Sequence, residues 1–319
     1  MTTTLDAPPL GPLLDDIVRT HRPRQEGGHT PANIPFLSTI PYDRFGIAVA
    51  TTSGDVFSSG DAGVAFSIQS ISKVFTLALA LQGGNPEALW QRVLREPSGT
   101  SFNSLVQLEA ELGIPRNPFI NAGALVVTDH LMQVTSDAAA QVLRFLTEQA
   151  GAAEPGSGSG SGTPYIDEAA AAGELARSSR NLALAHFLKD FGNLAAPAES
   201  VVENYVRQCS IMMTCSDLAR AALFLARDGQ GSRGAVLSRS QAKRIGSIML
   251  TCGMYDAAGE FAYRVGLPGK SGVGGGILVV VPGVCTICVW SPRLDAKGNS
   301  LAGTAALADL CEQTGWSVF

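Results

Sequence analysis

The stretch FSIQSISKVF, residues 66–75, places three serines close to one lysine. Only Ser70 lies three residues before Lys73, whereas Ser67 lies six residues away and Ser72 is adjacent and would face elsewhere on a helix. The SxxK spacing brings a hydroxyl and an amine onto one helical face, where a lysine of lowered pKa can accept the proton of the serine. The pattern therefore indicates either a nucleophilic serine or the polar edge of a buried helix.

The surrounding residues predict that this stretch is a strand-to-helix junction. Residues 45–66 alternate apolar and small polar side chains around Ser53-Gly54-Asp55, a turn signal that predicts a β-hairpin. Apolar residues then recur at helical spacing from residue 74 to residue 81, until Gly83-Gly84 ends the pattern. A serine at the start of a helix lies near free backbone N–H groups, which can stabilise an oxyanion.

The SxxK spacing alone is weak evidence, because it recurs at Ser240 and Lys243. We interpret that second copy as a charged, solvent-facing helix surface, with Ser238 or Ser240 as the helix cap. A further element supports Ser70: Lys270-Ser271-Gly272 precedes a glycine-rich turn and a β-branched run. SxxK at a helix start, followed by Lys-Ser/Thr-Gly at a strand, is typical of the serine β-lactamase and penicillin-binding fold.

The composition excludes several classes of protein. The 319 residues include 23 Lys and Arg against 28 Asp and Glu, a formal charge of −5 without a basic run, so nucleic acid is not an expected partner. The N-terminus lacks the pattern of a secretory signal, and the apolar stretches are too short to span a bilayer. We therefore expect a cytoplasmic protein without a membrane segment.

The cysteines and histidines do not predict a metal site. Cys285 and Cys288 lie three residues apart in a run that is typical of a strand, so they should point to opposite faces, and no second pair lies at zinc-site spacing. The four histidines are scattered along the chain and form no HxxxH pair. The cysteines lie mostly in apolar runs, as small core residues do, and do not indicate disulfides.

The order of the expected elements predicts an α/β (α+β) architecture. Strand patterns lie at both ends of the chain and helical patterns between them, so strands from the two ends can complete one sheet. We expect a discontinuous sheet domain, residues 1–69 and 246–319, with an antiparallel sheet flanked by helices. Residues 70–245 would form an inserted all-helical domain, with the active site at the interface. The Gly/Ser tract at 151–162, natural or engineered, should be a flexible surface loop.

Ordered stretches along nearly the whole chain resemble the serine-dependent glutaminase family, whose fold is that of the β-lactamases and DD-peptidases. The stretches are FSIQSISKVF at 66–75, EPSGTSFNSL at 96–105, NPFINAGAL at 117–125, ELARSSRNLALA at 174–185, YVRQCSI at 205–211, CGMYDAAGEFAYRVGLPGKSGVGGGI at 252–277 and the C-terminal TGWSVF.

The resemblance implies hydrolysis of L-glutamine to L-glutamate and ammonia without a metal or organic cofactor, by a homo-oligomer (dimer or tetramer). It implies that Ser70 is the nucleophile, Lys73 its base and Tyr255 a proton relay. The backbone of Val273, with that of Ser70, resembles the oxyanion hole. The residues that match the positions holding the α-amino and α-carboxylate groups of the substrate are Asn121, Glu174, Asn181 and Tyr205.

Each of these polar residues also has a structural interpretation. Asn121 could satisfy a turn, and Tyr205 or Tyr255 could be ordinary core. Glu174 and Asn181 are seven residues apart, so they could share a solvated helical face.

The chain departs from the family at one position in the expected pocket. The family carries a tyrosine in a Tyr-Ile-Pro motif that lines the pocket, whereas this chain reads Ala32-Asn33-Ile34-Pro35. Asn33 keeps a polar tip and loses the aromatic ring. The sequence therefore leaves undecided how this change affects substrate affinity and selectivity at that wall of the pocket.

Two further features of the sequence bear on the mechanism. Burial and a neighbouring cation, for which Lys270 is the candidate, could lower the pKa of Lys73. Residues 96–105 could form a lid.

The competing functions are hydrolysis of β-lactams or cell-wall peptides and a catalytically inactive sensor. The first lacks a convincing Ser-Asp-Asn motif, because Ser216-Asp217 is followed by Leu218.

Overall fold

The computed structural model describes residues 9–22, 27–31, 34–83, 86–99, 103–151 and 162–319. Its largest sheet is antiparallel, with the strand order β2-β1-β10-β9-β8. The bounds of these strands are β1 Gly46–Thr51, β2 Val56–Gly60, β8 Gly269–Ser271, β9 Gly276–Val281 and β10 Cys285–Trp290. The central pair, β1 and β10, joins the two ends of the chain, with Gly46 opposite Trp290. The predicted joint sheet is therefore confirmed.

The hairpin predicted before Ser70 is also confirmed. Strands β1 and β2 pair in antiparallel register, with Val49 opposite Phe57. Gly54 in the turn between them has φ +105°, a conformation that glycine adopts without steric cost.

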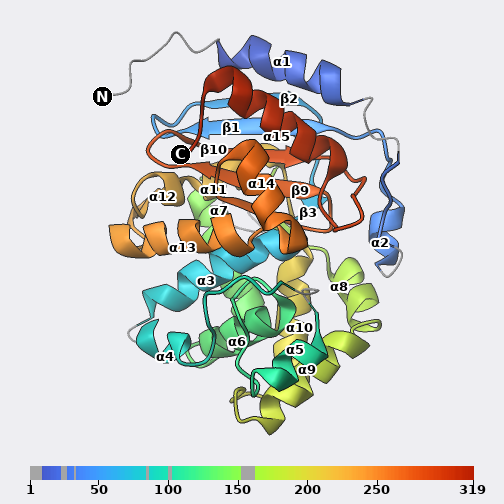
Figure 1. Cartoon of the computed structure of the whole chain (residues 1–319), viewed down its shortest axis with the longest axis vertical. Helices are drawn as coiled ribbons and strands as arrows, with labels where there is room; N and C mark the ends of the chain where they lie inside the picture. The colour runs from blue at the N-terminus through green and yellow to red at the C-terminus, as the bar shows by residue number, and fades with distance from the viewer. Residues whose placement is uncertain (1–8, 23–26, 32–33, 84–85, 100–102, 152–161) are drawn as a thin grey trace.

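The sheet separates two hydrophobic cores, because alternate residues of a strand point to opposite faces. One face packs against helices α1 Leu10–His21, α14 Ala258–Val265 and α15 Leu301–Thr314, as Figure 1 shows. The opposite face packs against helices from the middle of the chain. Cys285 belongs to the first core and Cys288 to the second, as their spacing predicted. All six cysteines are free.

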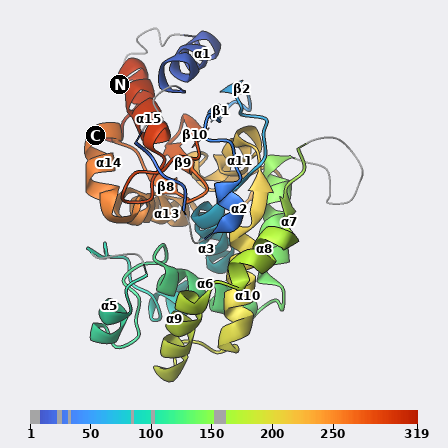
Figure 2. The same ribbon diagram turned by 90° about the vertical axis from the view of Figure 1, so that its right-hand side faces the viewer.

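The middle of the chain is rich in helices, most of which lie below the sheet in Figures 1 and 2, while α11 lies beside it. These helices are α3 Ser72–Gln82, α4 Pro86–Trp90, α5 Leu105–Ala110, α6 Asn121–Met132, α7 Ala138–Ala150, α8 Glu168–Leu175, α9 Ser179–Asp190, α10 Ala198–Cys209, α11 Cys215–Ala221, α12 Leu223–Ala226 and α13 Arg239–Cys252. The short helix α2 Pro35–Ser38 precedes the hairpin. Within the described ranges, no helix is both long enough and apolar enough to cross a membrane.

Helix α3 lies at the centre of the molecule, between the sheet and the other helices (Figure 2). Every residue from Ser72 to Leu81 is buried, which explains why the helix is apolar on all sides. The nucleophile candidate Ser70 thus precedes a helix that is buried from Ser72 to Leu81.

The short strands β4 Tyr165–Ile166 and β5 Ile211–Met213 in the helix-rich middle were not predicted from its helical periodicity. With β3 Phe66–Ser67 they form a small antiparallel sheet in the order β3-β5-β4. Strands β6 Gln230–Gly231 and β7 Gly234–Ala235 form a second small hairpin. The first of these sheets holds the chain immediately before Ser70.

Polar side chains and one glycine mark several helix boundaries. The side chains of Asp137 and Thr214 cap the N-termini of α7 and α11. Gly315, with φ +71°, ends α15. Ser238 caps α13 in a capping box, in which its Oγ accepts from Gln241 N and Gln241 Oε1 accepts from Ser238 N. Ser240 and Lys243 are both exposed, so the second SxxK is helix surface, as interpreted.

The two serines at the start of α13 provide a matched pair for a stability test. We expect Ser238→Ala to lower the free energy of unfolding by about 1 kcal/mol, because it leaves backbone N–H groups of the first turn without an acceptor. Ser240→Ala should change it by less than about 0.5 kcal/mol, because Ser240 is an exposed residue without a capping role. Chemical denaturation of both variants measures the difference, and equal midpoints would contradict the assignment of the cap.

Candidate active site

Ser70 lies in a single turn of 3-10 helix, η1 Gln69–Ile71, between strand β3 and helix α3. The predicted strand-to-helix junction is therefore confirmed. Gln69 has φ +47°, an uncommon conformation for a residue with a side chain, so the backbone turns sharply just before Ser70. The Ser70 side chain retains 7% exposure, whereas Ser67 and Ser72 are more deeply buried and do not line the cavity described below.

The glycine-rich turn between β8 and β9 packs directly on the chain that precedes Ser70. A Cβ atom at Gly272 would lie 2.6 Å from the Ile68 carbonyl oxygen, and one at Gly274 would lie 2.2 Å from that of Ser67. Only glycine permits this approach. Trp290 of β10 stacks on Phe66 with 5.1 Å between ring centroids, and its Nε1 donates to the Gly274 carbonyl oxygen at 3.0 Å. The sheet thus fixes the turn that carries the serine.

Lys73 lies beneath Ser70 with only 3% exposure. Its Nζ donates hydrogen bonds to the Phe119 carbonyl oxygen at 3.1 Å and to Asn121 Oδ1 at 2.8 Å. Burial lowers the pKa of Lys73 to about 8, although the negative charges of nearby groups, including Glu174, act in the opposite direction. An amine with this pKa is neutral often enough near neutral pH to act as a base.

A second lysine, Lys270 of β8, is fully buried on the other side of the site. Its Nζ donates to the carbonyl oxygens of Gly253 and Ser271 and lies 4.6 Å from the centroid of the Tyr255 ring. Burial, and next the charge of Lys73, lower the pKa of Lys270 well below its ordinary value. Burial is thus the leading cause of the lowered pKa at both lysines.

Tyr255 reaches the nucleophile from the sheet side of the site. It begins the 3-10 turn η2 Tyr255–Ala257 with φ +52°. Its hydroxyl interacts with the Ser70 side chain and the backbone of Val273, and it donates to the Ser271 carbonyl oxygen at 3.3 Å. Burial raises the pKa of Tyr255, so the hydroxyl keeps its proton near neutral pH. The phenol is therefore able to pass a proton at the reacting atoms.

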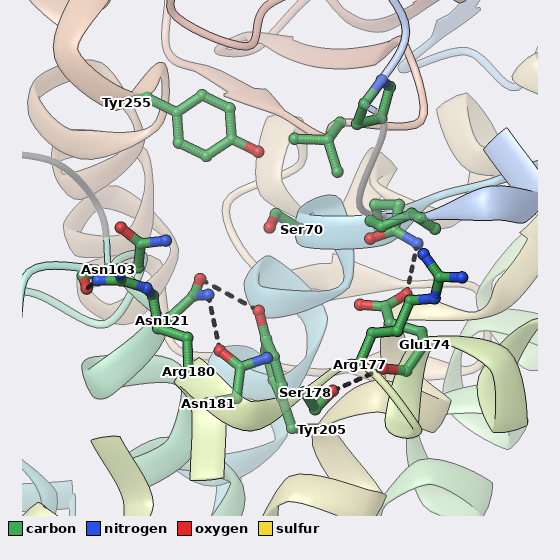
Figure 3. A pocket seen from close by; sticks show the side chains of 14 residues that line it. Ser70, Asn103, Asn121, Glu174, Arg177, Ser178, Arg180, Asn181, Tyr205 and Tyr255 are labelled. Carbon is green, nitrogen blue, oxygen red and sulfur yellow. Dashed lines mark hydrogen bonds between the residues drawn. The ribbon is translucent and has the colours of Figure 1, made fainter. Parts of the chain in front are cut away.

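Asn121, the first residue of α6, makes hydrogen bonds both to Lys73 and to two other polar residues of the site. Its Oδ1 accepts from Lys73 Nζ and from the Tyr205 hydroxyl, the latter at 3.2 Å. Its Nδ2 donates to Asn181 Oδ1 at 3.0 Å, and Figure 3 shows the two contacts with Tyr205 and Asn181. The interpretation of Asn121 as a residue that merely satisfies a turn does not account for these contacts.

Glu174 and Asn181 line the same cavity but do not share a helical face. Glu174 belongs to α8 and Asn181 to α9, and the chain leaves the helical path between them. The interpretation based on their spacing is therefore wrong, because it assumed one continuous helix. Glu174 Oε2 accepts from Gln69 Nε2 at 3.1 Å. Burial raises the pKa of Glu174, opposed by the hydrogen bond from Gln69 and the charge of Lys73.

These residues surround a cavity of about 300 Å³. Of the residues expected at the site, all except Lys73 line it: Ser70, Asn121, Glu174, Asn181, Tyr205, Tyr255 and Val273. Figure 3 shows that the labelled side chains converge on this cavity from both the sheet and the helical side. Lys73 does not line the cavity itself, but its Nζ donates a hydrogen bond to Asn121, which does.

Sequence reasoning missed several residues that line the same cavity: Pro31, Ile34, Gln69, Asn103, Arg177, Ser178 and Arg180. Gln69 adjoins the nucleophile, and its Nε2 also donates to Ser67 Oγ at 3.1 Å, so Ser67 supports the turn. The two arginines belong to the stretch ELARSSRN, where their charge was the available signal.

Some expectations fall on residues outside the described ranges. Asn33 is one of them, although its neighbours Pro31 and Ile34 line the cavity. Residues 100–102 of the expected lid and 152–161 of the Gly/Ser tract also lie outside. In the part of the chain that the structure describes, no group of three or more His, Cys, Asp or Glu side chains could hold a metal ion.

Comparison with known proteins identifies relatives over the full length of the chain. The family model described as Glutaminase matches residues 28–319. A curated protein named Glutaminase from Streptomyces coelicolor is 53% identical over 320 residues, which cover 100% of this chain and 99% of the relative.

Solved structures give the same result. A Bacillus subtilis probable glutaminase superposes with a TM-score of 0.87 at 33% identity, covering 97% of this chain and 98% of that one. A structure described as Mglu in its tris and glutamate form has a TM-score of 0.88 at 36% identity, covering 100% of this chain and 68% of that one. The expected β-lactamase-like fold is thereby confirmed. This chain belongs to the glutaminase family.

Proposed function

We propose that this protein is a glutaminase that hydrolyses L-glutamine to L-glutamate and ammonia through an acyl-enzyme on Ser70. The observation that carries the mechanism is that the Tyr255 hydroxyl interacts with Ser70 in the wall of a cavity, and that Ser70 lies one helical turn before a buried lysine of lowered pKa. Glu174 and amide side chains line the other end of the cavity, as an amino-acid substrate requires. Membership in the glutaminase family supports the choice of substrate.

In the first step, Ser70 Oγ attacks the carbon of the glutamine side-chain amide, and Lys73 accepts the hydroxyl proton. The backbone N–H groups of Ser70 and Val273 stabilise the negative oxygen of the tetrahedral intermediate. The carbon–nitrogen bond then breaks, and ammonia leaves with a proton delivered through Lys73 or Tyr255. The Ser70 hydroxyl oxygen is now bound as a glutamyl ester.

In the second step, a water molecule attacks the ester and transfers a proton to the same base. The bond to Ser70 Oγ breaks, the serine regains a proton, and glutamate is released. Tyr255 suits the relay because it interacts with Ser70 and stays protonated. Both steps use groups of this chain and water only.

The opposite end of the cavity holds the α-substituents of the substrate in this proposal. The Glu174 carboxylate pairs with the α-ammonium group. Asn121 and Asn181 donate amide hydrogen bonds to the α-carboxylate, and the Tyr205 hydroxyl turns its single proton from Asn121 Oδ1 to the same group when substrate binds. Their mutual hydrogen bonds support this arrangement, since they fix the side chains before substrate arrives.

We further propose the domain division 1–69 with 246–319, and 70–245, with the active site at the interface. Side chains from both sides of that division line the cavity, which supports the proposal. The family resemblance supports a homo-oligomer, a dimer or tetramer, that works in the cytoplasm. The net charge of −5 argues against nucleic acid as a partner.

The nucleophile is tested by Ser70→Ala. We expect this variant to lose ammonia release from glutamine by at least about a thousandfold, because no other group replaces the attacking oxygen. Its circular dichroism and melting curve should match those of the wild type, since the change removes one atom at the edge of a cavity. Turnover retained at the wild-type rate would exclude Ser70 as the nucleophile.

A chromogenic cephalosporin assay of the wild type separates the competing functions. A glutaminase should release ammonia from glutamine and leave the cephalosporin intact. The β-lactamase alternative requires the opposite result, and a catalytically inactive sensor should turn over neither compound.

The base is tested by the pH dependence of kcat/KM for glutamine. Lys73 must be neutral to accept a proton, and its pKa is lowered to about 8. Protonation at lower pH therefore inactivates the base, so kcat/KM should fall about tenfold for each pH unit well below that value and level off above it. A profile that stays flat from pH 6 to 9 would argue against Lys73. Lys73→Arg, which stays protonated, should be inactive throughout.

The departure at Asn33 is tested by restoring the family residue. We expect Asn33→Tyr to lower KM for glutamine with little change in kcat, because it restores the ring and hydroxyl that the family carries in its Tyr-Ile-Pro motif. Steady-state kinetics of the two proteins decide the point, and equal KM values would mean that the departure is neutral.

A further inference from the structure

One loop outside the cavity lies against Tyr255. Residues 295–299, which we name the Tyr255 clamp, belong to the connection between β10 and α15. Asp295 closes the loop, because its Oδ1 accepts from the backbone N–H groups of Lys297 at 2.8 Å and Asn299 at 3.0 Å. Its own N–H donates to the Asn299 carbonyl oxygen at 2.8 Å. The loop is therefore fixed by its own hydrogen bonds.

The clamp holds the main chain on both sides of Tyr255. Asn299 is 1% exposed, and its Nδ2 donates to the Met254 carbonyl oxygen at 3.4 Å. Only the nitrogen of a side-chain amide can donate to a carbonyl, so this contact sets the orientation of the amide. Lys297 Nζ donates to the Asp256 carbonyl oxygen at 3.3 Å. The two bonds thus restrain the residue before the tyrosine and the residue after it.

Gly298 brings the clamp close to the ring of Tyr255. A Cβ atom at this position would lie 3.7 Å from the ring and 3.9 Å from the Val273 side chain. Gly298 has φ +90°, at which a side chain would be strained, so glycine allows the loop to turn at this point. Val273 is the residue whose backbone N–H belongs to the proposed oxyanion hole. The clamp therefore adjoins two parts of the proposed catalytic machinery.

Tyr255 needs such support because its backbone conformation is unfavourable. Its φ of +52° lies in a region that few residues with a side chain adopt. A conformation of this kind persists only where the surrounding contacts impose it. Figure 3 shows the Tyr255 side chain reaching toward Ser70 from the sheet side of the cavity. Relaxation of the main chain would move the ring, and with it the hydroxyl that interacts with Ser70.

We propose that the Tyr255 clamp sets the position of the phenol beside Ser70, with Gly298 and Asn299 as positioning residues. The effect of the clamp on rate rests on the proposed function, in which Tyr255 passes a proton at the reacting atoms. Neither positioning residue lines the cavity, so neither contacts the substrate. Loss of the clamp should therefore lower kcat and leave the binding of glutamine at the opposite wall, where Glu174 lies, unchanged.

The kinetic test compares two glycines with the same backbone requirement. Gly283, in the turn between β9 and β10, has φ +75°, and a Cβ atom there would meet nothing within 4 Å. Alanine adds backbone strain at either position, so Gly298→Ala and Gly283→Ala should melt at similarly lowered temperatures. Only Gly298→Ala should lower kcat for glutamine, by about ten- to a hundredfold, because a small displacement of a catalytic group has an effect of this size.

The value of KM separates this role from a general loosening of the site. In Gly298→Ala we expect KM for glutamine to stay within about twofold of the wild-type value. The connection between β10 and α15 also holds the cavity wall near Pro31, because Leu294 pairs with His29. Displacement of that wall would raise KM instead. Equal kcat values for the Gly298→Ala and Gly283→Ala variants, or an increase in KM alone, would overturn the inference.

A spectroscopic measurement reports on the clamp without turnover. The chain contains five tyrosines, and labelling with fluorotyrosine gives each of them a fluorine NMR signal. The signal of Tyr255 is the one that disappears in Tyr255→Phe. Asn299→Leu keeps the approximate size of the side chain and removes the donor to the Met254 carbonyl oxygen, so it should shift the Tyr255 signal and leave the others in place.

The two measurements fail in different ways. A shifted Tyr255 signal in Asn299→Leu would support the clamp even if the wild type released no ammonia from glutamine, a result that would contradict the proposed function alone. An unchanged Tyr255 signal would overturn the clamp itself, whatever the activity of the wild type.

Discussion

The site depends on one constraint: the amine of Lys73 must be buried and still hydrogen-bonded. Water would keep the amine protonated, so helix α3 is enclosed on all sides and places Lys73 among apolar neighbours. A buried amine without partners would be costly, and the Phe119 carbonyl and Asn121 Oδ1 satisfy it. Asn121 also hydrogen-bonds to Tyr205 and Asn181, so the residues proposed to bind the substrate are positioned by a residue that holds the proposed base.

The local features of this site could be predicted from the sequence, and its assembly could not. Spacing and turn residues predicted the hairpin, the junction at Ser70 and the cap of α13, because these depend on neighbours in the chain. The meeting of Asn121, Glu174 and Tyr205 depends on helix packing and was expected only from the family resemblance. Glu174 and Asn181 illustrate the limit: ELARSSRN has no glycine or proline to mark the break between α8 and α9.

The dependence on helix packing also explains why sequence reasoning missed several residues that line the cavity. Whether an arginine in a polar stretch faces solvent or a cavity depends on the direction in which its helix ends, which the sequence does not indicate. Arg177 and Arg180 lie three residues apart, yet the Arg180 side chain donates to the Asn103 carbonyl oxygen, whereas the Arg177 side chain makes no hydrogen bond or ion pair with the described residues. The small strands β4 and β5 were missed for a similar reason, since each is too short to produce a recognisable alternation and forms because the other is there.

The pairing of β1 with β10 has a consequence for how activity first appears in a cell. The turn that carries Ser70 is held by Gly272, Gly274 and Trp290, some two hundred residues later in the chain. Contacts of such high sequence separation form late in folding. A ribosome must therefore release nearly the whole chain before the catalytic turn can be fixed. Nascent and truncated chains would not carry out the reaction, so the fold couples catalysis to the completion of synthesis.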